Sequence, residues 1–286
     1  LLEGAIDYAG LFPPAALGME DAARNYLEYA LGSDAWALGR FVVPMTRLDE
    51  LHRVAVELAA ADRVAWRLSV LAGASPAAEA VQLREFLARA GSAWSVEAIE
   101  AKAASAMDIE ALSALVTDWR LYVEIPLGGE IEVAARRVNA LGASVKIRTG
   151  GITAEAFPAA SQLAHALLTC ARIPVPFKAT AGLHHPIRAE YPLTYALDSG
   201  SGTMFGYLNL LLAAVLARRQ ASEELVTQLL EERDPTAFAL GDDVLRWRAE
   251  VFGMEEVRGT RTEFVHGFGS CSFREPLDEF TAPGVS

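Results

Sequence analysis

Residues 121–149 read LYVEIPLGGEIEVAARRVNALGASVKIRT, and two short apolar runs in this stretch flank a segment with helical spacing. The runs Leu121–Pro126 and Ser144–Thr149 predict buried strands, and Glu130–Leu141 predicts an amphipathic helix. A connection of this length joins two parallel strands of one sheet. The stretch therefore predicts a βαβ unit, the building block of an α/β protein.

The same alternation extends over most of the chain. Further strands are expected at Ala5–Leu11, Leu38–Pro44, Trp66–Ala72, Trp94–Ala98, Val175–Thr180 and Glu263–Phe273. Further helices are expected at Met19–Leu31, Leu48–Ala60, Pro76–Ala90 and Ile109–Val116, and then at Phe205–Arg218, Ser222–Glu232 and Gly241–Phe252. Eight strands in 286 residues match a (β/α)8 TIM barrel, with an inserted helical segment before the last strand.

The chain shows no composition break that marks a linker, so we expect a single domain over residues 1–286. The alternative is an open doubly wound sheet. Its dinucleotide-binding version is not supported, because no G-x-G-x-x-G motif follows the first strand. The apolar segment Phe205–Arg218 fits either a buried barrel helix or the interface of a homo-oligomer.

Composition excludes several classes of partner. The chain has 25 basic and 37 acidic residues, for a net charge of −12, whereas nucleic-acid binders usually carry a basic face. The apolar stretch at residues 205–217 is too short to cross a membrane. Two cysteines and no basic-then-apolar leader predict a reducing, cytoplasmic compartment. We therefore expect a small-molecule substrate.

Charged residues interrupt the expected strands at positions that point into a barrel. Strand side chains alternate between two faces, so Val145 and Ile147 would face the helices while Lys146 and Arg148 point inward. The same rule turns Lys178 inward on the seventh strand.

Carboxylates occupy inward positions on other strands. Asp7 points inward on the first strand and Glu124 on the fifth, and the fourth strand offers Glu97, or Glu100 in the other phase. Buried charges must pair. Because these residues fall at the C-terminal ends of strands, where barrel enzymes build active sites, they indicate a catalytic site. The alternative is a structural ion-pair network that plugs the barrel.

The inward lysines suggest amine chemistry. Cations in a low-dielectric pocket reduce the proton affinity of a lysine amine, which then attacks a carbonyl to form a Schiff base. Lys146 and Lys178 lie on adjacent strands and fit such a pair, with Arg148 as a further cation.

Two segments resemble deoxyribose-phosphate aldolases, class I aldolase barrels with lysines on strands six and seven. These segments are Val145-Lys-Ile-Arg-Thr-Gly150 and Phe177-Lys-Ala-Thr-Ala-Gly182. The resemblance implies that Lys146 forms the Schiff base and that Lys178 tunes it. Arg148 and the pair His184 and His185 have no counterpart in the family.

Loop residues near the same end supply further candidates. We expect His184 or His185 to act as an acid, a base or a substrate-orienting group, or, with Asp7, Glu97 or Glu124, to bind a divalent metal; the third alternative is a structural role in the loop. Two loops are expected either to contact substrate through Gly150, Gly151, Ser270 and Ser272 or to be only glycine-rich turns that packing requires. Cys271 is expected to be a packed side chain, or else a thiolate paired with His266.

Three functional hypotheses follow. The first is a cofactor-free carbon–carbon lyase in which Lys146 forms a Schiff base with a small aldehyde, keto sugar or keto acid, and Glu124 or a loop histidine moves the proton. The second is a metal-dependent hydrolase, isomerase or lyase. The third is a non-catalytic barrel that binds an anionic metabolite through Lys146, Arg148 and Lys178.

Overall fold

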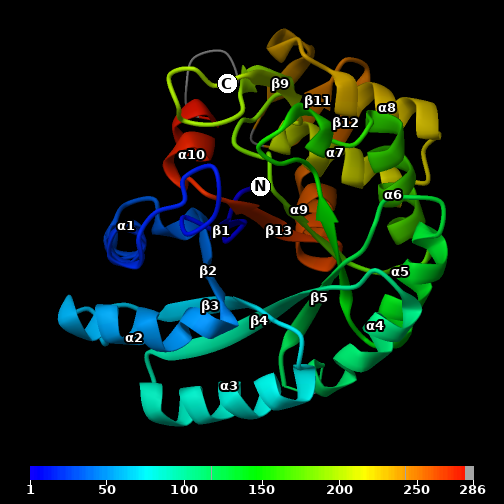
Figure 1. Ribbon diagram of the computed structural model, residues 1–286. Coiled ribbons are helices and arrows are strands. Elements are labelled where there is room, and N and C mark those ends of the chain that lie inside the picture. Colours follow the sequence, from blue (N-terminus) through cyan, green and yellow to red (C-terminus); the bar gives the residue numbers. More distant parts are fainter. Residues whose placement is uncertain (117, 242, 281–286) are drawn as a thin grey trace.

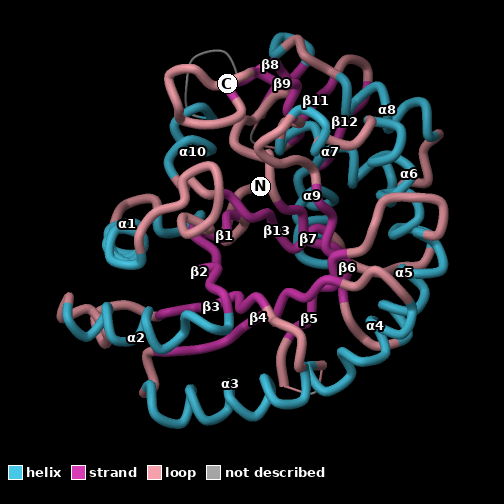
Figure 2. Tube along the Cα trace, viewed as in Figure 1, coloured by secondary structure: helices cyan, strands magenta, loops and turns pink. Residues whose placement is uncertain are grey.

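The computed structural model describes residues 1–116, 118–241 and 243–280 and contains a closed barrel of eight parallel strands (Figures 1 and 2). Each strand pairs with the next along the chain, and the last pairs with the first. The barrel strands are β1 (Ile6–Tyr8), β2 (Leu38–Pro44), β3 (Trp66–Leu71), β4 (Trp94–Lys102), β5 (Arg120–Glu124), β6 (Ser144–Arg148), β7 (Phe177–Thr180) and β13 (Val265–Ser270). The predicted TIM barrel is thus confirmed, and all eight predicted strand positions are occupied.

Helices surround the barrel, as Figure 2 shows. Between the first seven strands lie α1 (Met19–Leu31), α2 (Leu48–Glu57), α3 (Pro76–Ala90), α4 (Ala106–Ala111), α5 (Ile131–Ala140) and α6 (Ala160–Arg172). Helix α3 illustrates the local cause. It starts at Pro76, buries Leu83 and Phe86, and ends at Gly91, whose φ of 93° stops the helix. The predicted bounds of α1 and α3 agree with the structure.

The insertion before the last barrel strand is partly helical and partly a small sheet. It contains a hairpin of β8 (Ala189–Pro192) and β9 (Ser201–Met204), helices α7 (Tyr207–Arg218), α8 (Glu223–Glu231) and α9 (Met254–Glu263), and an antiparallel sheet of β10 (Phe238–Leu240), β11 (Val244–Trp247) and β12 (Glu250–Gly253). Helix α10 (Arg274–Phe280) follows the last barrel strand.

The helix predicted at Gly241–Phe252 is wrong, although residue 242 itself lies outside the described part. Leu245 and Trp247 are buried while Arg246 between them is exposed, which is the two-residue period of a strand. Arg248 then adopts a φ of 52° in the turn that leads to β12. Over this short range the sequence fits both the 3.6-residue period of a helix and the two-residue period of a strand. The turn at Arg248 selects the strands, because it brings β12 back alongside β11.

Helix α7 explains the apolar segment noted above. Nearly all of its side chains are buried within the chain, in contact with α6 and α8. Of the helices that the structure describes, none combines the length and the apolar composition needed to cross a membrane.

Candidate active site

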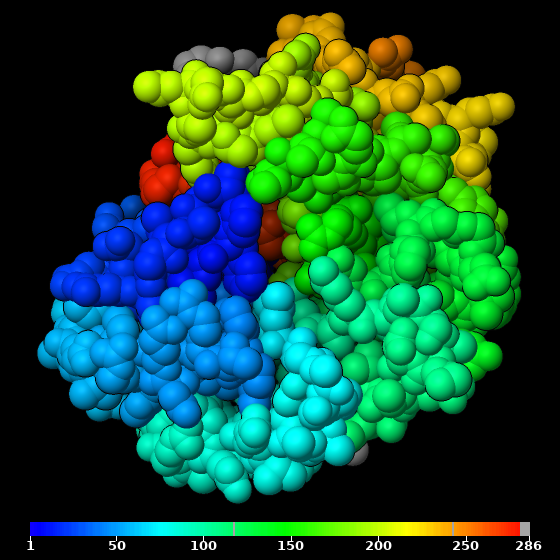
Figure 3. All heavy atoms as spheres, viewed as in Figure 1, coloured from blue at the N-terminus to red at the C-terminus, as the bar shows by residue number. Residues whose placement is uncertain are grey.

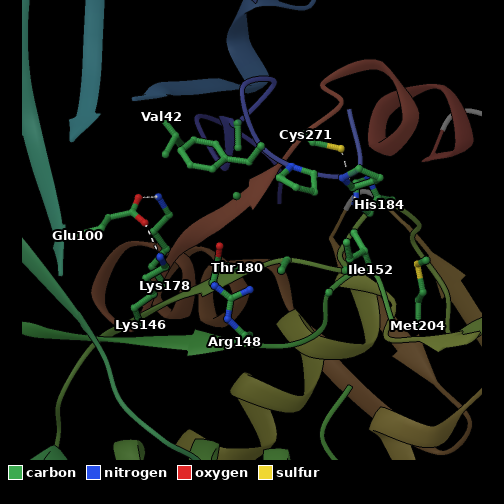
Figure 4. A pocket seen from close by; sticks show the side chains of 18 of the residues that line it. Val42, Glu100, Lys146, Arg148, Ile152, Lys178, Thr180, His184, Met204 and Cys271 are labelled. Carbon is green, nitrogen blue, oxygen red and sulfur yellow. Dashed lines mark hydrogen bonds and ion pairs between the residues drawn. The ribbon is translucent and has the colours of Figure 1, made fainter. Parts of the chain in front are cut away.

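Lys146 and Lys178 lie side by side at the centre of the site. They are register partners on β6 and β7, and both are buried. Glu100 of β4 lies between their amino groups. Its Oε2 atom is 2.9 Å from the Nζ atom of Lys146, and its Oε1 atom accepts a hydrogen bond from the Nζ atom of Lys178. One carboxylate therefore bridges the two lysines, as Figure 4 shows.

Two further carboxylates complete the lysine pairs. The Nζ atom of Lys178 is 2.5 Å from Oδ2 of Asp7, and that of Lys146 is 2.9 Å from Oε2 of Glu124. Arg148 also bonds to Glu124, with its Nε atom 2.8 Å from Oε1. The inward orientation predicted for these residues is found in the structure, so the charges meet at one end of the barrel.

The fourth strand places both of its glutamates in the charge network. Glu97 and Glu100 are three positions apart, which would put them on opposite faces of a regular strand. The pairing of β3 with β4 shifts register between Leu68 and Ser69, an irregularity of the kind that a β-bulge produces. Glu100 therefore meets the lysines, and Glu97 forms ion pairs with the Nε atoms of Arg40 at 3.0 Å and Arg67 at 3.4 Å.

Glu100 is the site residue that the predicted strand phase left open, and its environment explains its role. Its side chain is only 3% exposed, and Ser69 donates a hydrogen bond of 2.6 Å to its Oε1 atom. Asp7 is held in a similar way, because the backbone N–H of Arg40 donates to its Oδ1 atom at 2.6 Å. Gly39 permits that approach, since a Cβ atom there would lie 2.2 Å from the same oxygen.

The electrostatics keep these groups ionised. Burial alone would raise the pKa of Glu100, but the charges of Lys146 and Lys178 outweigh it and hold that pKa far below its usual value. The pKa values of Asp7 and Glu124 are lowered for the same reason, against the effect of burial. Burial would lower the pKa of Lys178, but Asp7 and Glu100 raise it, so this lysine remains an ammonium ion.

Acid should therefore destabilise the fold through these carboxylates. Groups with a lowered pKa in the folded state contribute stability in full above their ordinary pKa, 4.5 for Glu100, and lose it as the pH falls. We expect the free energy of unfolding, measured with urea, to fall as the pH drops from 4.5 to about 3. Glu100→Gln should make this decline shallower, and an equal decline in both proteins would contradict the assignment.

The lysines line a cavity of about 280 Å³ at the C-terminal ends of the strands. Figure 3 shows a hollow on this face, between the N-terminal segment in blue and the segments in green. Glu100, Lys146, Lys178 and Arg148 form a charged wall. The rest of the lining is largely apolar and includes Phe12, Pro13, Pro14, Ile152, Leu193 and Met204.

The two loop histidines lie in different surroundings. His184 is buried and lines the cavity. His185 stacks on Tyr191, with ring centroids 3.5 Å apart, and its Nδ1 atom is 2.7 Å from Glu279. Within the part of the chain that the structure describes, neither ring forms a hydrogen bond or ion pair with a strand carboxylate, and their carboxylate partners are Glu275 and Glu279 of α10.

Only some of the loop residues predicted to contact substrate line the cavity. Gly151 lines it, whereas Gly150 accommodates Phe157, whose Cε1 atom would lie 2.3 Å from a Cβ atom at this position. Ser272 accepts a hydrogen bond of 3.2 Å from the N–H of Glu275, and Ser270 Oγ lies 3.4 Å from Nδ1 of His184. Both serine hydroxyls thus have partners within the protein.

Lysine usage is a signal in the sequence that the strand analysis did not use. Only three of the 25 basic residues are lysines, namely Lys102, Lys146 and Lys178. Arginine serves at every other basic position, but two of the three lysines are buried together in the barrel. Lysine usage in this chain is therefore concentrated at the site, whereas arginine, which cannot lose its proton in a protein, supplies the basic charge elsewhere.

No group of three or more His, Cys, Asp or Glu side chains within residues 1–116, 118–241 and 243–280 is arranged to hold a metal ion. Comparisons with protein-family models, curated proteins and solved structures found no significant match to this chain. The class of protein is thus defined by its fold and its side chains. TIM barrels commonly carry enzyme active sites at the C-terminal ends of their strands, where this cavity lies.

Proposed function

We propose that this protein is a carbon–carbon lyase that forms a Schiff base between Lys146 and a small carbonyl substrate. One observation carries the proposal: at the cavity wall, the two buried lysines share the two oxygens of Glu100. A lysine amine, a carboxylate that can accept a proton and a second lysine that stays charged are then in contact at one point, and imine formation uses groups of these kinds. The resemblance of the two lysine segments to class I aldolases agrees with it.

Lys146 is the better nucleophile of the pair. Lys178 is held by Asp7 and Glu100, and both of these carboxylates are fully ionised at neutral pH. Each partner of Lys146 is instead shared with a second cation, Glu100 with Lys178 and Glu124 with Arg148. Lys146 is therefore the less tightly held ammonium ion.

The charge-paired cluster contains one more cation than carboxylates. Within the described chain, the ion pairs connect five cations with four carboxylates, namely Arg40, Arg67, Lys146, Arg148 and Lys178 with Asp7, Glu97, Glu100 and Glu124. One positive charge of the network is thus not balanced by a carboxylate.

The proposed reaction begins when the neutral Lys146 amine attacks the carbonyl carbon. Glu124 or Glu100, each 2.9 Å from Nζ, takes a proton from the nitrogen of the adduct and passes it to the carbinolamine oxygen, which takes up a further proton from solvent and leaves as water. The protonated imine accepts the electron pair of the adjacent carbon–carbon bond as this bond breaks, and the hydroxyl on the departing carbon gives its proton to Glu124 and becomes a carbonyl. Protonation of the resulting enamine at carbon and hydrolysis of the imine then release the second product and return the Lys146 amine. Lys178 remains charged and keeps Glu100 in place.

The cavity limits the substrate class. Its volume of about 280 Å³ suits a small aldehyde, keto acid or keto sugar. Arg148 at the charged wall is positioned to bind an anionic group such as a carboxylate or phosphate. We also propose a reducing, cytoplasmic location, because both cysteines, Cys170 and Cys271, are free thiols.

Oxygen exchange into a carbonyl panel tests the proposal. An enzyme that forms an imine reversibly exchanges the carbonyl oxygen of its substrate with solvent. We therefore expect the protein in ¹⁸O-labelled water to accelerate label uptake into one class among small aldehydes, ketones, keto acids and sugar phosphates. If the protein accelerates label uptake into none of these compounds, the proposal is contradicted, and the charged cluster is a structural ion-pair network that fills the barrel.

A further inference from the structure

A second group of reactive side chains lines the same cavity, away from the lysines. Cys271, His184 and Glu275 form a chain of contacts in which Nε2 of His184 is 4.0 Å from the Sγ atom of Cys271. Nδ1 of the same ring is 3.0 Å from Oε2 of Glu275. Figure 4 shows Cys271 and His184 together on one side of the pocket and Lys146, Lys178 and Glu100 on the other.

Three separate segments bring this cluster together. Cys271 directly follows β13, His184 lies in the loop after β7, and Glu275 belongs to the first turn of α10. Cys271 and His184 are buried side chains that line the cavity. The interpretation that His266 pairs with Cys271 is wrong, because His266 lies at the other end of β13 and packs on Tyr122.

The third residue fixes the ring of the second. Because Glu275 holds Nδ1 of His184, Nε2 is the atom that faces the thiol. Tyr195 supports this arrangement, since its hydroxyl donates to Oε2 of Glu275 at 2.9 Å and lies 3.6 Å from the Sγ atom of Cys271. A nucleophile, a base within reach and a group that orients the base are the three parts of a nucleophilic relay.

The electrostatics favour a protonated imidazole at His184. Burial would lower the pKa of His184, but its hydrogen bonds to Cys271 and Glu275 outweigh it and raise the pKa to about 9. A cationic imidazolium beside a thiol stabilises the thiolate form. Cys170 differs because no cation offsets its burial, which raises the pKa of its thiol to about 12.

We propose that Cys271 is a nucleophile that accepts an acyl group from a small ester or thioester, with His184 as its acid and base and Glu275 as the positioning residue. The thiolate attacks the acyl carbon, a new S–C bond forms, and the bond to the leaving oxygen or sulfur breaks. The imidazolium of His184 gives its proton to that leaving group. No oxidant or reductant is required.

The surroundings indicate an apolar acyl chain. Pro14, Leu193 and Met204 line the cavity together with His184. The same residues border the adjoining pocket, which also includes Tyr195 and Glu275. A short aliphatic acyl group would therefore pack beside the thiol with little polar desolvation.

The test uses p-nitrophenyl butyrate as a chromogenic acyl donor. We expect a burst of one nitrophenolate per chain, and mass spectrometry of peptides should place the butyryl group on Cys271 and leave Cys170 free. His184→Gln should slow the burst about 100-fold, while Cys170→Ser, the matched control, should react as the wild type. A butyryl group found on other residues with Cys271 free would overturn the proposal, as would a wild-type burst rate in His184→Gln.

A pH profile of alkylation tests the positioning role of Glu275 and does not depend on the acyl donor. The rate at which iodoacetamide modifies Cys271 reports the thiolate fraction. Glu275→Gln keeps a hydrogen-bond acceptor but removes a charge, so the midpoint of the profile should move to higher pH. The other titratable groups around the pair are His185 and Glu279, Tyr195, and Tyr8 of β1, all of them unchanged in this variant. An unshifted midpoint would show that Glu275 is merely structural.

Acyl adducts and imines lie on different side chains, so the two proposals fail separately. A butyryl group maps to Cys271, whereas an imine maps to a lysine, and the chain has only two cysteines and three lysines.

Discussion

Replacement of Lys146 by methionine is expected to abolish carbonyl oxygen exchange and turnover while leaving the protein folded. Loss of a covalent nucleophile lowers turnover on the order of 10⁴-fold or more. The fold should persist because no carboxylate is left without a cation: Glu124 keeps Arg148, and Glu100 keeps Lys178. Oxygen exchange on the panel and circular dichroism measure the two effects.

Lys102→Met is the matched control, because Lys102 is the one lysine of the sequence outside the pair and is exposed at the end of β4. It should exchange oxygen at the wild-type rate. Activity retained in Lys146→Met and lost in Lys178→Met would reverse the assigned roles of the two lysines. Activity retained in both variants would remove the imine from the mechanism.

Replacement of Glu100 by leucine should give the largest loss of stability in the site. This change removes the carboxylate that bridges two buried ammonium groups and leaves the hydroxyl of Ser69 without its acceptor. Removal of one partner from a buried ion pair costs about 3–5 kcal/mol. Urea unfolding of the variant at neutral pH measures this cost.

Two variants make the result specific. Glu97→Leu, on the same strand, removes a carboxylate that is 34% exposed, and Arg40 keeps its contact with Asp7, so we expect a loss of about 1 kcal/mol or less. The double variant Glu100→Leu/Lys178→Met removes one orphaned charge as well and should be more stable than Glu100→Leu alone. If the losses of stability caused by Glu100→Leu and by Lys178→Met simply add in the double variant, the ion pair between Glu100 and Lys178 does not account for the loss in Glu100→Leu.

The strands were predictable because their signal is local. Each barrel strand is a short run of apolar residues with a polar residue facing inward, as in Val145-Lys146-Ile147, and this alternation decides both the strand and the direction of its side chains. Five of the charged residues in the site follow from it. Glu100 could not be chosen over Glu97, because the irregular register between β3 and β4 is a property of strand pairing and has no local signature.

The loops and the insertion were less predictable because distant contacts determine them. The contact of Cys271 with His184 joins residues 87 positions apart, and Glu275 reaches the same ring from a helix after the last strand. The serines expected at a ligand instead bond to His184 and to the start of α10. A glycine-rich, serine-rich composition predicts a turn but not the partner of each hydroxyl.

Borohydride trapping with peptide mapping tests the imine most directly. The protein is reduced in the presence of the carbonyl compound that gives oxygen exchange, and the adduct is located by mass spectrometry among its three lysines and its N-terminus. We predict one adduct per chain on Lys146, with Lys102 unmodified. An unmodified Lys146, with no adduct or with one confined to Lys102 or the N-terminus, would contradict Schiff-base chemistry in this barrel.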